Sequence, residues 1–241
     1  MQENNVESKE INDRQPNSQQ QIAGAILLAG IMIAGAILLK GGDQAPTTSG
    51  SVTNNATDTA FLGKPVSSDD HILGNPKAKI VIVEYSDLEC PYCKVFHNTM
   101  HKVIENNSDV AWVYRHYPIP QLHPKAFKEA EATECAFEQG GNDAFWSYAD
   151  RVFEITASND KLDPAELPKI AEYIGLEIAS FNHCLQTNGR TAEVQADIDD
   201  GGKAGVSGTP SSFILVKGKQ VGTIPGAQSY ETIMQQLEKL K

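Results

Sequence analysis

Basic residues are scarce in this chain relative to acidic ones, with 20 Lys and Arg against 31 Asp and Glu and a net charge of −11 over 241 residues. Proteins bind nucleic acids through Lys and Arg side chains that displace counterions from phosphates, so this balance argues against a nucleic-acid partner. The 4 cysteines are too few for a disulfide-dense scaffold. The hydrophobic share of 40% is ordinary for a globular protein, which excludes a wholly disordered or fibrous chain.

One long apolar run stands near the N-terminus, where Ile22 to Leu39 contains 18 consecutive Ile, Ala, Gly, Leu and Met residues. As a helix it would be about 27 Å long, close to the ~30 Å hydrocarbon core of a bilayer. A cleaved signal peptide is the alternative, but its apolar region is usually shorter, and Asp43 occupies the −3 position of the best Ala cleavage site. We therefore expect an uncleaved transmembrane anchor at 22–39.

The segments on either side of this run are polar. Residues 1–21 are rich in Asn, Gln and Glu and are expected to be disordered, and residues 40–68 are expected to form a flexible linker. Lys9 and Arg14 precede the run and Lys40 follows it, which favours a cytoplasmic N-terminus only weakly. The remaining residues, 69–241, are enough for one folded domain.

Within that domain the hydrophobic pattern predicts strand, helix and strand in succession. Residues 79–85 form a β-rich apolar run without polar alternation, typical of a strand buried on both faces. A helix is predicted from Pro91 to about Asn106, and a second strand over 110–116. Such a βαβ unit should be parallel and right-handed.

The rest of the domain changes from helices back to strands. Helices are predicted from Pro124, from Asp143 and from Asp163, and near 177–187 and 190–204. Strands follow over 211–216 and 219–224, joined by a hairpin turn, and Ser229 is the predicted cap of a last helix. We therefore expect an α/β domain in which a helical block, about 120–206, separates βαβ from ββα.

The cysteine motif Cys90-Pro-Tyr-Cys93 lies between the buried strand and its helix. Cys90 falls at the helix start, where unpaired N–H groups and the positive end of the helix dipole favour a thiolate. Cys93 follows one turn later and can close a small disulfide with Cys90. Glu84, Asp87 and Glu89 crowd the motif with negative charge and argue against an acidic thiol.

A structural zinc site is the alternative explanation of this motif, because zinc commonly binds Cys-x-x-Cys pairs. His97 and His101 lie on the same helix, but Cys93 and His101 would be about 12 Å apart along its axis. Zinc needs four ligands, and the other two cysteines lack this spacing. We expect both histidines to be partly exposed helix residues, and we expect no metal or cofactor.

The segment from Glu84 to His97 resembles the active-site segment of DsbA-family thiol:disulfide oxidoreductases, and so does the segment from Gly205 to Phe213. The resemblance covers about 69–241 and implies a thioredoxin fold with an inserted helical subdomain, preceded here by one transmembrane helix.

The resemblance also implies roles for individual residues. Cys90 would be the exposed nucleophile and Cys93 the buried resolving cysteine. Pro210 would be a cis-proline packed against the disulfide, and Pro91, Tyr92 and Thr209 would contact substrate.

The sequence also leads to expectations for Glu84, Cys135 and Cys184. Glu84 interrupts an apolar strand, so it is either an edge residue that reaches water or, as in the family, a buried acid below Cys93 that manages its proton. Cys135 and Cys184 are either free buried cysteines or a structural disulfide, and the resemblance favours the disulfide.

These features together favour a membrane-anchored enzyme whose domain oxidises thiols of proteins outside the cytoplasm and is reoxidised by a membrane partner. A reductase or isomerase of the same fold is the first alternative, because the motif does not fix the direction of electron flow. A non-catalytic zinc- or copper-binding module is the more remote alternative.

Overall fold

The computed structural model describes residues 59–240, which form one α/β domain. The strands are β1 (Thr59–Ala60), β2 (His71–Gly74), β3 (Ile80–Ser86), β4 (Val110–His116), β5 (Ser211–Val216) and β6 (Lys219–Pro225). The helices are α2 (Pro91–Asn106), α3 (Ala126–Ile155), α4 (Glu166–Tyr173), α5 (Ile178–Gln186), α6 (Thr191–Ala204) and α7 (Tyr230–Glu238).

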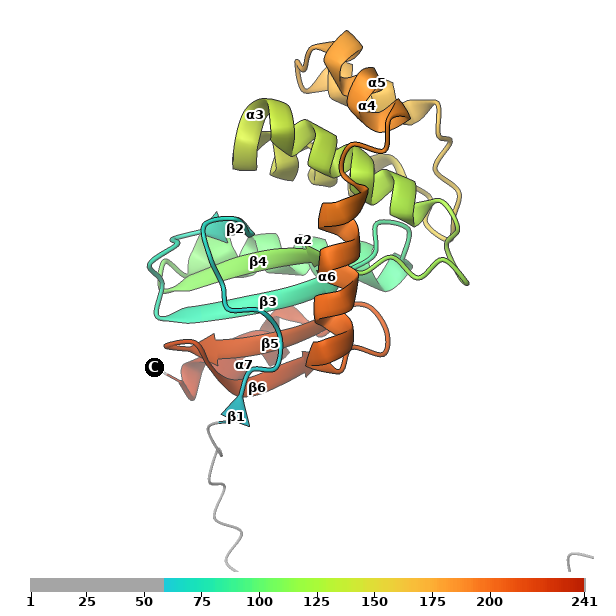
Figure 1. Ribbon diagram of the computed structural model, residues 1–241. Helices are drawn as coiled ribbons and strands as arrows, with labels where there is room; N and C mark the ends of the chain where they lie inside the picture. Colours follow the sequence, from blue (N-terminus) through green and yellow to red (C-terminus); the bar gives the residue numbers. More distant parts are fainter. Residues whose placement is uncertain (1–58, 241) are drawn as a thin grey trace, which may run out of the picture. The chain divides into compact units, whose positions relative to one another are not determined.

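The strands form one sheet in the order β1-β6-β5-β3-β4-β2 (Figure 1). β3 and β4 are parallel and α2 connects them, as the βαβ prediction requires, whereas the other neighbouring pairs are antiparallel. β5 and β6 form the predicted hairpin. Lys217 and Gly218 at its turn both have positive φ, 53° and 76°, which is the backbone that two-residue hairpin turns favour.

β3 occupies the centre of the sheet and is buried on both faces, which confirms the prediction from its continuous apolar sequence. Successive side chains of a strand point to opposite faces. Ile80 and Ile82 therefore pack into the core cluster that includes α2 and α7, whereas Val83 and Tyr85 pack into the cluster on the opposite side. α6 covers that opposite face (Figure 1). By the same alternation Glu84 points toward the α2 side.

Four helices, α3 to α6, lie between β4 and β5 and form the helical insertion. α3 starts at Ala126, two residues after Pro124, and its helical geometry is interrupted at Gly141, where φ is 63°. The predicted separate helices at Pro124 and Asp143 are thus two halves of one kinked element. α4 starts at Glu166, because Asp163 and Pro164 form the turn that precedes it.

Residues 59–68 belong to the folded domain, so the flexible linker expected over 40–68 is wrong for this part. The Phe61 ring packs against Phe213 at 5.3 Å between centroids. The Lys64 backbone N–H donates to Asp200 at 2.5 Å, and its Nζ contacts Asp197 at 2.9 Å. The short edge strands β1 and β2 were not predicted, since two and four residues are too few for a periodic pattern.

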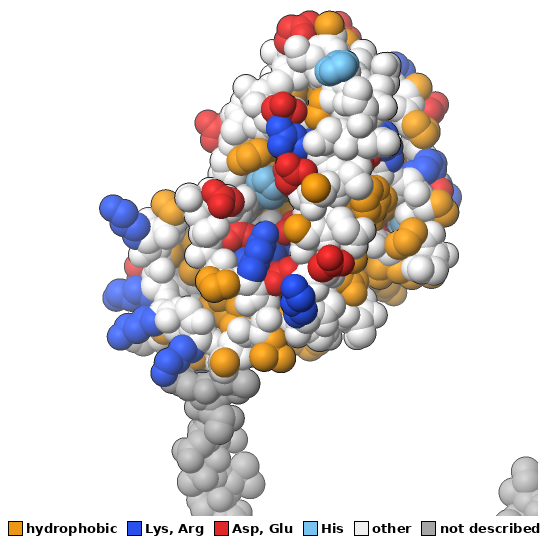
Figure 2. All heavy atoms as spheres, in the orientation of Figure 1, with side chains coloured by type: hydrophobic (Ala, Val, Ile, Leu, Met, Phe, Trp, Pro, Cys, Tyr) orange, Lys and Arg blue, Asp and Glu red, His pale blue; other side chains and the backbone are white. Residues whose placement is uncertain are grey.

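A buried ionic network ties β4 to Asp70, just before β2, and to α6. The fully buried Arg115 donates to Asp70 from Nε at 2.8 Å and to Asp200 from Nη1 at 2.9 Å. Tyr85 also donates to Asp200, at 2.5 Å. On the surface of this face, acidic and basic side chains lie close to one another (Figure 2). The network fixes α6, and with it the chain that leads into β5.

Across residues 59–240, none of the helices combines the length and the apolar character needed to span a bilayer. The predicted disordered tail 1–21, the predicted anchor 22–39 and residues 40–58 of the predicted linker lie outside the described residues.

Candidate active site

Cys90 is the N-cap residue of α2, with Pro91 at the first helical position. Its backbone is extended, with φ −75° and ψ 123°, and its carbonyl accepts the first hydrogen bond of the helix from Lys94. No side chain caps the helix start, and the backbone N–H groups of Tyr92 and Cys93 help to lower the pKa of Cys90. This is the placement that the sequence predicted.

The two cysteines are chemically unequal. A hydrogen bond from the Cys93 thiol lowers the pKa of Cys90 to about 6 against the opposing effect of burial, with further help from the Cys93 backbone and Thr209. Burial raises the pKa of Cys93 well above its usual value, and the neighbouring Cys90 and Glu84 raise it further. At neutral pH the pair therefore carries one thiolate, on Cys90.

The expectation of an exposed Cys90 is wrong, because the residue is only 5% exposed. The Thr209 carbonyl covers its sulfur at 3.5 Å. The preceding residue, Glu89, is held by the segment that follows α3, whose Asn159 N–H donates to the Glu89 carbonyl at 2.7 Å. The Cys90 sulfur is therefore largely shielded from solvent.

The acids near the motif are engaged elsewhere. Asp87 accepts hydrogen bonds from the Glu89 and Ile119 backbones and contacts His123 Nδ1 at 2.9 Å. Glu89 accepts from the Thr156 hydroxyl and from the backbones of Lys161 and Leu162. Both carboxylates thus hold the loops around the site, which resolves the conflict that their position in the sequence raised.

Glu84 lies inside the protein, fully buried on β3. Trp112 Nε1 donates to its Oε2 at 2.9 Å, and its Oε1 has no hydrogen-bond partner among residues 59–240. Burial raises the pKa of Glu84 to about 8, so the side chain keeps its proton at neutral pH. The edge position reaching water, one of the two alternatives, is excluded.

The segment before β5 completes the site. The Thr209–Pro210 peptide bond is cis, and the Pro210 carbonyl accepts from Gly226. Tyr92, beside Cys90, is 67% exposed, and Pro91 and Thr209 are partly exposed. The structure therefore gathers the predicted cysteines, Glu84, the cis-proline and the predicted substrate-binding residues at one end of α2.

Cys135 and Cys184 form a disulfide that joins α3 to α5. Their Cα atoms are 5.9 Å apart and the two positions are 49 residues apart in sequence. This distance is within the range that a disulfide needs, which the sequence did not show.

The structure corrects the predicted exposure of His97, one of the two histidines of α2. His97 is 2% exposed, not partly exposed, because its ring packs beside Phe153 and Trp112. Its Nε2 contacts Asp150 of α3, and His101 contacts the same carboxylate oxygen. Burial lowers the pKa of His97, whereas hydrogen bonds from His101 and His97 outweigh burial and lower the pKa of Asp150 to about 2.

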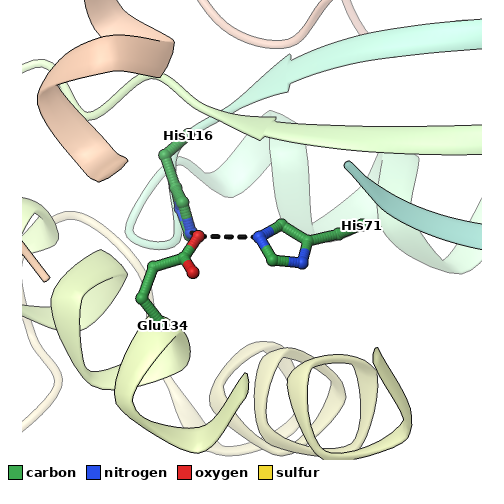
Figure 3. A group of neighbouring side chains, drawn as sticks. All are labelled: His71, His116 and Glu134. Atoms are coloured by element: carbon green, nitrogen blue, oxygen red, sulfur yellow. Dashed lines mark hydrogen bonds and ion pairs between the residues drawn. The ribbon is translucent and has the colours of Figure 1, made fainter. Parts of the chain in front are cut away.

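A second histidine group, also missed, is His71, His116 and Glu134. The Glu134 carboxylate lies between the two imidazoles, which come from β2 and β4 (Figure 3). No sequence pattern marks this group or the His123 contact, because the partners are far apart in the chain. A histidine at the end of a predicted buried strand, as at 116, was the one available signal.

The chain resembles known proteins in sequence and in fold. A protein family described as thioredoxin matches residues 67–239. Among solved structures, DsbA2 from Pseudomonas aeruginosa is similar with 29% identity and a TM-score of 0.63, over 74% of this chain and 97% of that one. Oxidised BdbD from Bacillus subtilis is similar in fold, with 22% identity and a TM-score of 0.64, over 75% of this chain and 97% of that one.

Curated relatives resemble only part of the chain. A Na(+)/H(+) antiporter NhaA 3 from Salinispora tropica is 36% identical over 151 residues, which are 62% of this chain and 22% of that protein. The antiporter NhaA of Herminiimonas arsenicoxydans is 30% identical over 155 residues, 64% of this chain and 24% of the relative. The chain thus spans about a quarter or less of the length of these relatives.

Proposed function

The chain belongs to the thioredoxin family, and on that premise we propose that it is a thiol–disulfide oxidoreductase that oxidises the cysteines of proteins outside the cytoplasm. The observation that carries the proposal is the inequality of the two thiols. Cys90 sits at the α2 N-cap against the Thr209 carbonyl, whereas Cys93 is fully buried over Glu84.

The reaction starts from the oxidised pair. A substrate thiolate attacks Cys90 Sγ, the Cys90–Cys93 bond breaks, and the bonding electrons leave with Cys93 as a thiolate. Burial makes that anion costly, so it takes up a proton, and the protonated carboxyl of Glu84, which acts electrostatically on Cys93, is a buried source.

The second step releases the product. A second thiolate of the substrate attacks the substrate sulfur of the mixed disulfide, and Cys90 leaves as a thiolate. A thiol with a low pKa is a good leaving group, so the pKa of about 6 at Cys90 favours this step. The substrate loses two electrons and becomes a disulfide, and Cys90 and Cys93 become the dithiol. A separate oxidant, which we propose to be a membrane protein, must remove those two electrons.

The same asymmetry supports a direction of electron flow from substrate to enzyme. Reduction creates a Cys90 thiolate that the helix start and Cys93 stabilise, and this stabilises the dithiol relative to the disulfide. Each tenfold stabilisation raises the reduction potential of the pair by about 30 mV. The geometry therefore favours an oxidant over the reductase or isomerase alternative.

Exposed apolar side chains are candidates for binding the substrate. Tyr92, Val95 and Leu122 are large hydrophobic side chains exposed by 67%, 59% and 66%. A surface hollow of about 390 Å³ is lined by Tyr117, Ile119, Phe127 and Ile198 among others, and the Ile119 backbone donates to Asp87, three residues before Cys90. We propose that unfolded protein segments bind here beside Cys90.

We also propose that residues 22–39 anchor the chain and that the domain faces the extracytoplasmic side. The length of the apolar run supports the anchor. The Cys135–Cys184 disulfide supports an oxidising compartment, since structural disulfides are rare in the cytosol. Protease protection of intact cells or spheroplasts tests this, and a domain protected together with cytosolic markers would contradict it.

The decisive test is the reduction potential of the Cys90–Cys93 pair, measured by equilibration with glutathione. We expect a value well above the roughly −270 mV of thioredoxin and nearer the roughly −120 mV of DsbA. The dithiol form should also unfold at a higher temperature than the disulfide form. A potential at or below that of thioredoxin, with the disulfide form the more stable, would contradict the oxidase proposal.

A further inference from the structure

A group of potential metal ligands lies where α2 meets α3, one to two turns after Cys93. His97 and His101 are four residues apart and share one face of the helix, and Asp150 approaches them from α3. The Nε2 atoms of the two histidines are 3.2 Å apart. The Asp150 Oδ1 lies 2.6 Å from the first and 2.8 Å from the second.

This triangle is slightly smaller than one face of a metal coordination sphere, and an outward movement of the exposed Asp150 side chain would widen it. Zinc binds imidazole nitrogen and carboxylate oxygen at about 2.0–2.2 Å, so neighbouring ligand atoms lie roughly 3–3.5 Å apart. A pair of histidines at i and i+4 on one helix face is a spacing that binds zinc. We propose that His97, His101 and Asp150 bind one Zn²⁺ ion, with water completing the coordination.

The ligands combine one fixed side chain with two accessible ones. The His97 side chain is 3% exposed and packs between aromatic rings, which hold its Nε2 toward the group. The side chains of His101 and Asp150 are 27% and 45% exposed. An ion can therefore reach the site from solvent, and an open side remains for water, as a metal site requires.

The buried group His71, His116 and Glu134 provides the contrast (Figure 3). Its side chains are 6%, 1% and 5% exposed. The His71 ring stacks on Phe145 with 3.5 Å between centroids, and the carboxylate already links the two imidazoles. A surface hollow of about 380 Å³ reaches His71 and Glu134, but His116 is enclosed and the Glu134 carboxylate is already held between the two rings, so we assign this group a structural role.

The proposed site uses neither active-site cysteine. It lies on the same helix as Cys93, about one turn further along, and joins α2 to the helical insertion through Asp150. Zn²⁺ binding should therefore persist when Cys90 and Cys93 are joined by a disulfide, and it should stabilise the contact between α2 and α3.

Zn²⁺ titration of the full-length oxidised chain, purified without a histidine tag, tests the proposal. Competition with a chromophoric chelator gives the stoichiometry and affinity, and thermal unfolding reports stabilisation. We expect one ion per chain and a rise in Tm with Zn²⁺. His101→Gln and Asp150→Asn should each weaken binding by at least the roughly 10–100-fold that loss of an outer-shell partner costs.

Two matched variants serve as controls. His183 is an exposed histidine of α5, and Glu154 is an exposed carboxylate one turn after Asp150. His183→Gln and Glu154→Gln should bind Zn²⁺ as the native chain does. The proposal is overturned if the oxidised chain binds no Zn²⁺, if binding requires free Cys90 and Cys93, or if His101→Gln and Asp150→Asn bind as tightly as the controls.

Discussion

The two cysteine pairs of this protein lie in contrasting surroundings. Cys90 and Cys93 are three positions apart at the start of one helix, beside helix N–H groups and a buried acid. Cys135 and Cys184 are 49 residues apart and join α3 to α5 within the helical insertion. At the first pair the structure distinguishes the two sulfurs, with the pKa of one lowered and that of the other raised.

This difference shows which features distinguish a reactive cysteine pair from a structural one. A reactive pair needs one sulfur that is stable as a thiolate and one that is not, which helix position and burial provide. A structural pair needs only the correct distance and a long loop, because its effect is to restrict the unfolded chain. Each cysteine pair can therefore be altered by mutation without altering the other.

The largest expected effect is the loss of thiol oxidation on removing the nucleophile. Cys90→Ser should reduce oxidation of a dithiol peptide to the uncatalysed rate, because no sulfur remains for the substrate to attack. Given a peptide that already contains a disulfide, Cys93→Ser should instead trap a mixed disulfide, because the Cys90 thiolate attacks one peptide sulfur, releases the other as a thiol, and no Cys93 is present to displace the peptide. The trapped species is visible on a non-reducing gel. Equal activity of Cys90→Ser and the native chain would show that Cys90 is not the reactive sulfur.

The second expected effect concerns stability. Replacing both Cys135 and Cys184 by Ala should lower the free energy of unfolding by about 4 kcal/mol, the chain-entropy value for a 49-residue loop. The reduction potential of Cys90–Cys93 should stay the same. Chemical denaturation measures the first quantity and glutathione equilibration the second, and a changed potential would show that the pairs are coupled.

The third effect is the pH dependence caused by Glu84. Its pKa is about 8 in the folded protein, above the ordinary value of about 4.3, so the folded state keeps a proton that the unfolded state loses. Stability from this residue is therefore full below about pH 4 and falls as the pH rises to about 8.

Glu84→Gln should remove this loss while retaining an acceptor for Trp112. Its unfolding free energy relative to the native chain should increase between pH 5 and pH 8, by on the order of a few kcal/mol. Denaturation at several pH values measures it. Glu105→Gln, at an exposed position on α2, is the control and should show no such trend.

The smallest effect tests how Cys93 acts on Cys90. The Cys93 thiol is the largest contributor to the low pKa of Cys90, and a Ser hydroxyl can donate the same hydrogen bond. The thiolate absorbance of Cys93→Ser should therefore titrate near pH 6, and that of Cys93→Ala at a higher pH. A midpoint above about 7.5 in Cys93→Ser would contradict an acidic Cys90 thiol.

Much of the fold was predictable because its signals are local. The apolar run of β3, the proline after Cys90 and the Lys217-Gly218 turn each specify a conformation through neighbouring residues. The short strands β1 and β2 gave no such signal. Residues 59–68 look like a linker by composition, yet Phe61 and Lys64 are held by partners more than a hundred residues away.

The candidate site also has features that the sequence predicted and features that it did not. The sequence by itself determined that Cys90 lies at a helix start with Cys93 one turn later, because a strand, a proline and a helix pattern surround the motif. Only the tertiary structure decided that Glu84 is buried against Trp112 and that Asp87 and Glu89 bind loops instead of crowding the thiolate. It likewise decided that Asp150 meets His97. These contacts join residues far apart in the chain, and their distances depend on how the sheet and helices pack, which periodicity and spacing do not encode.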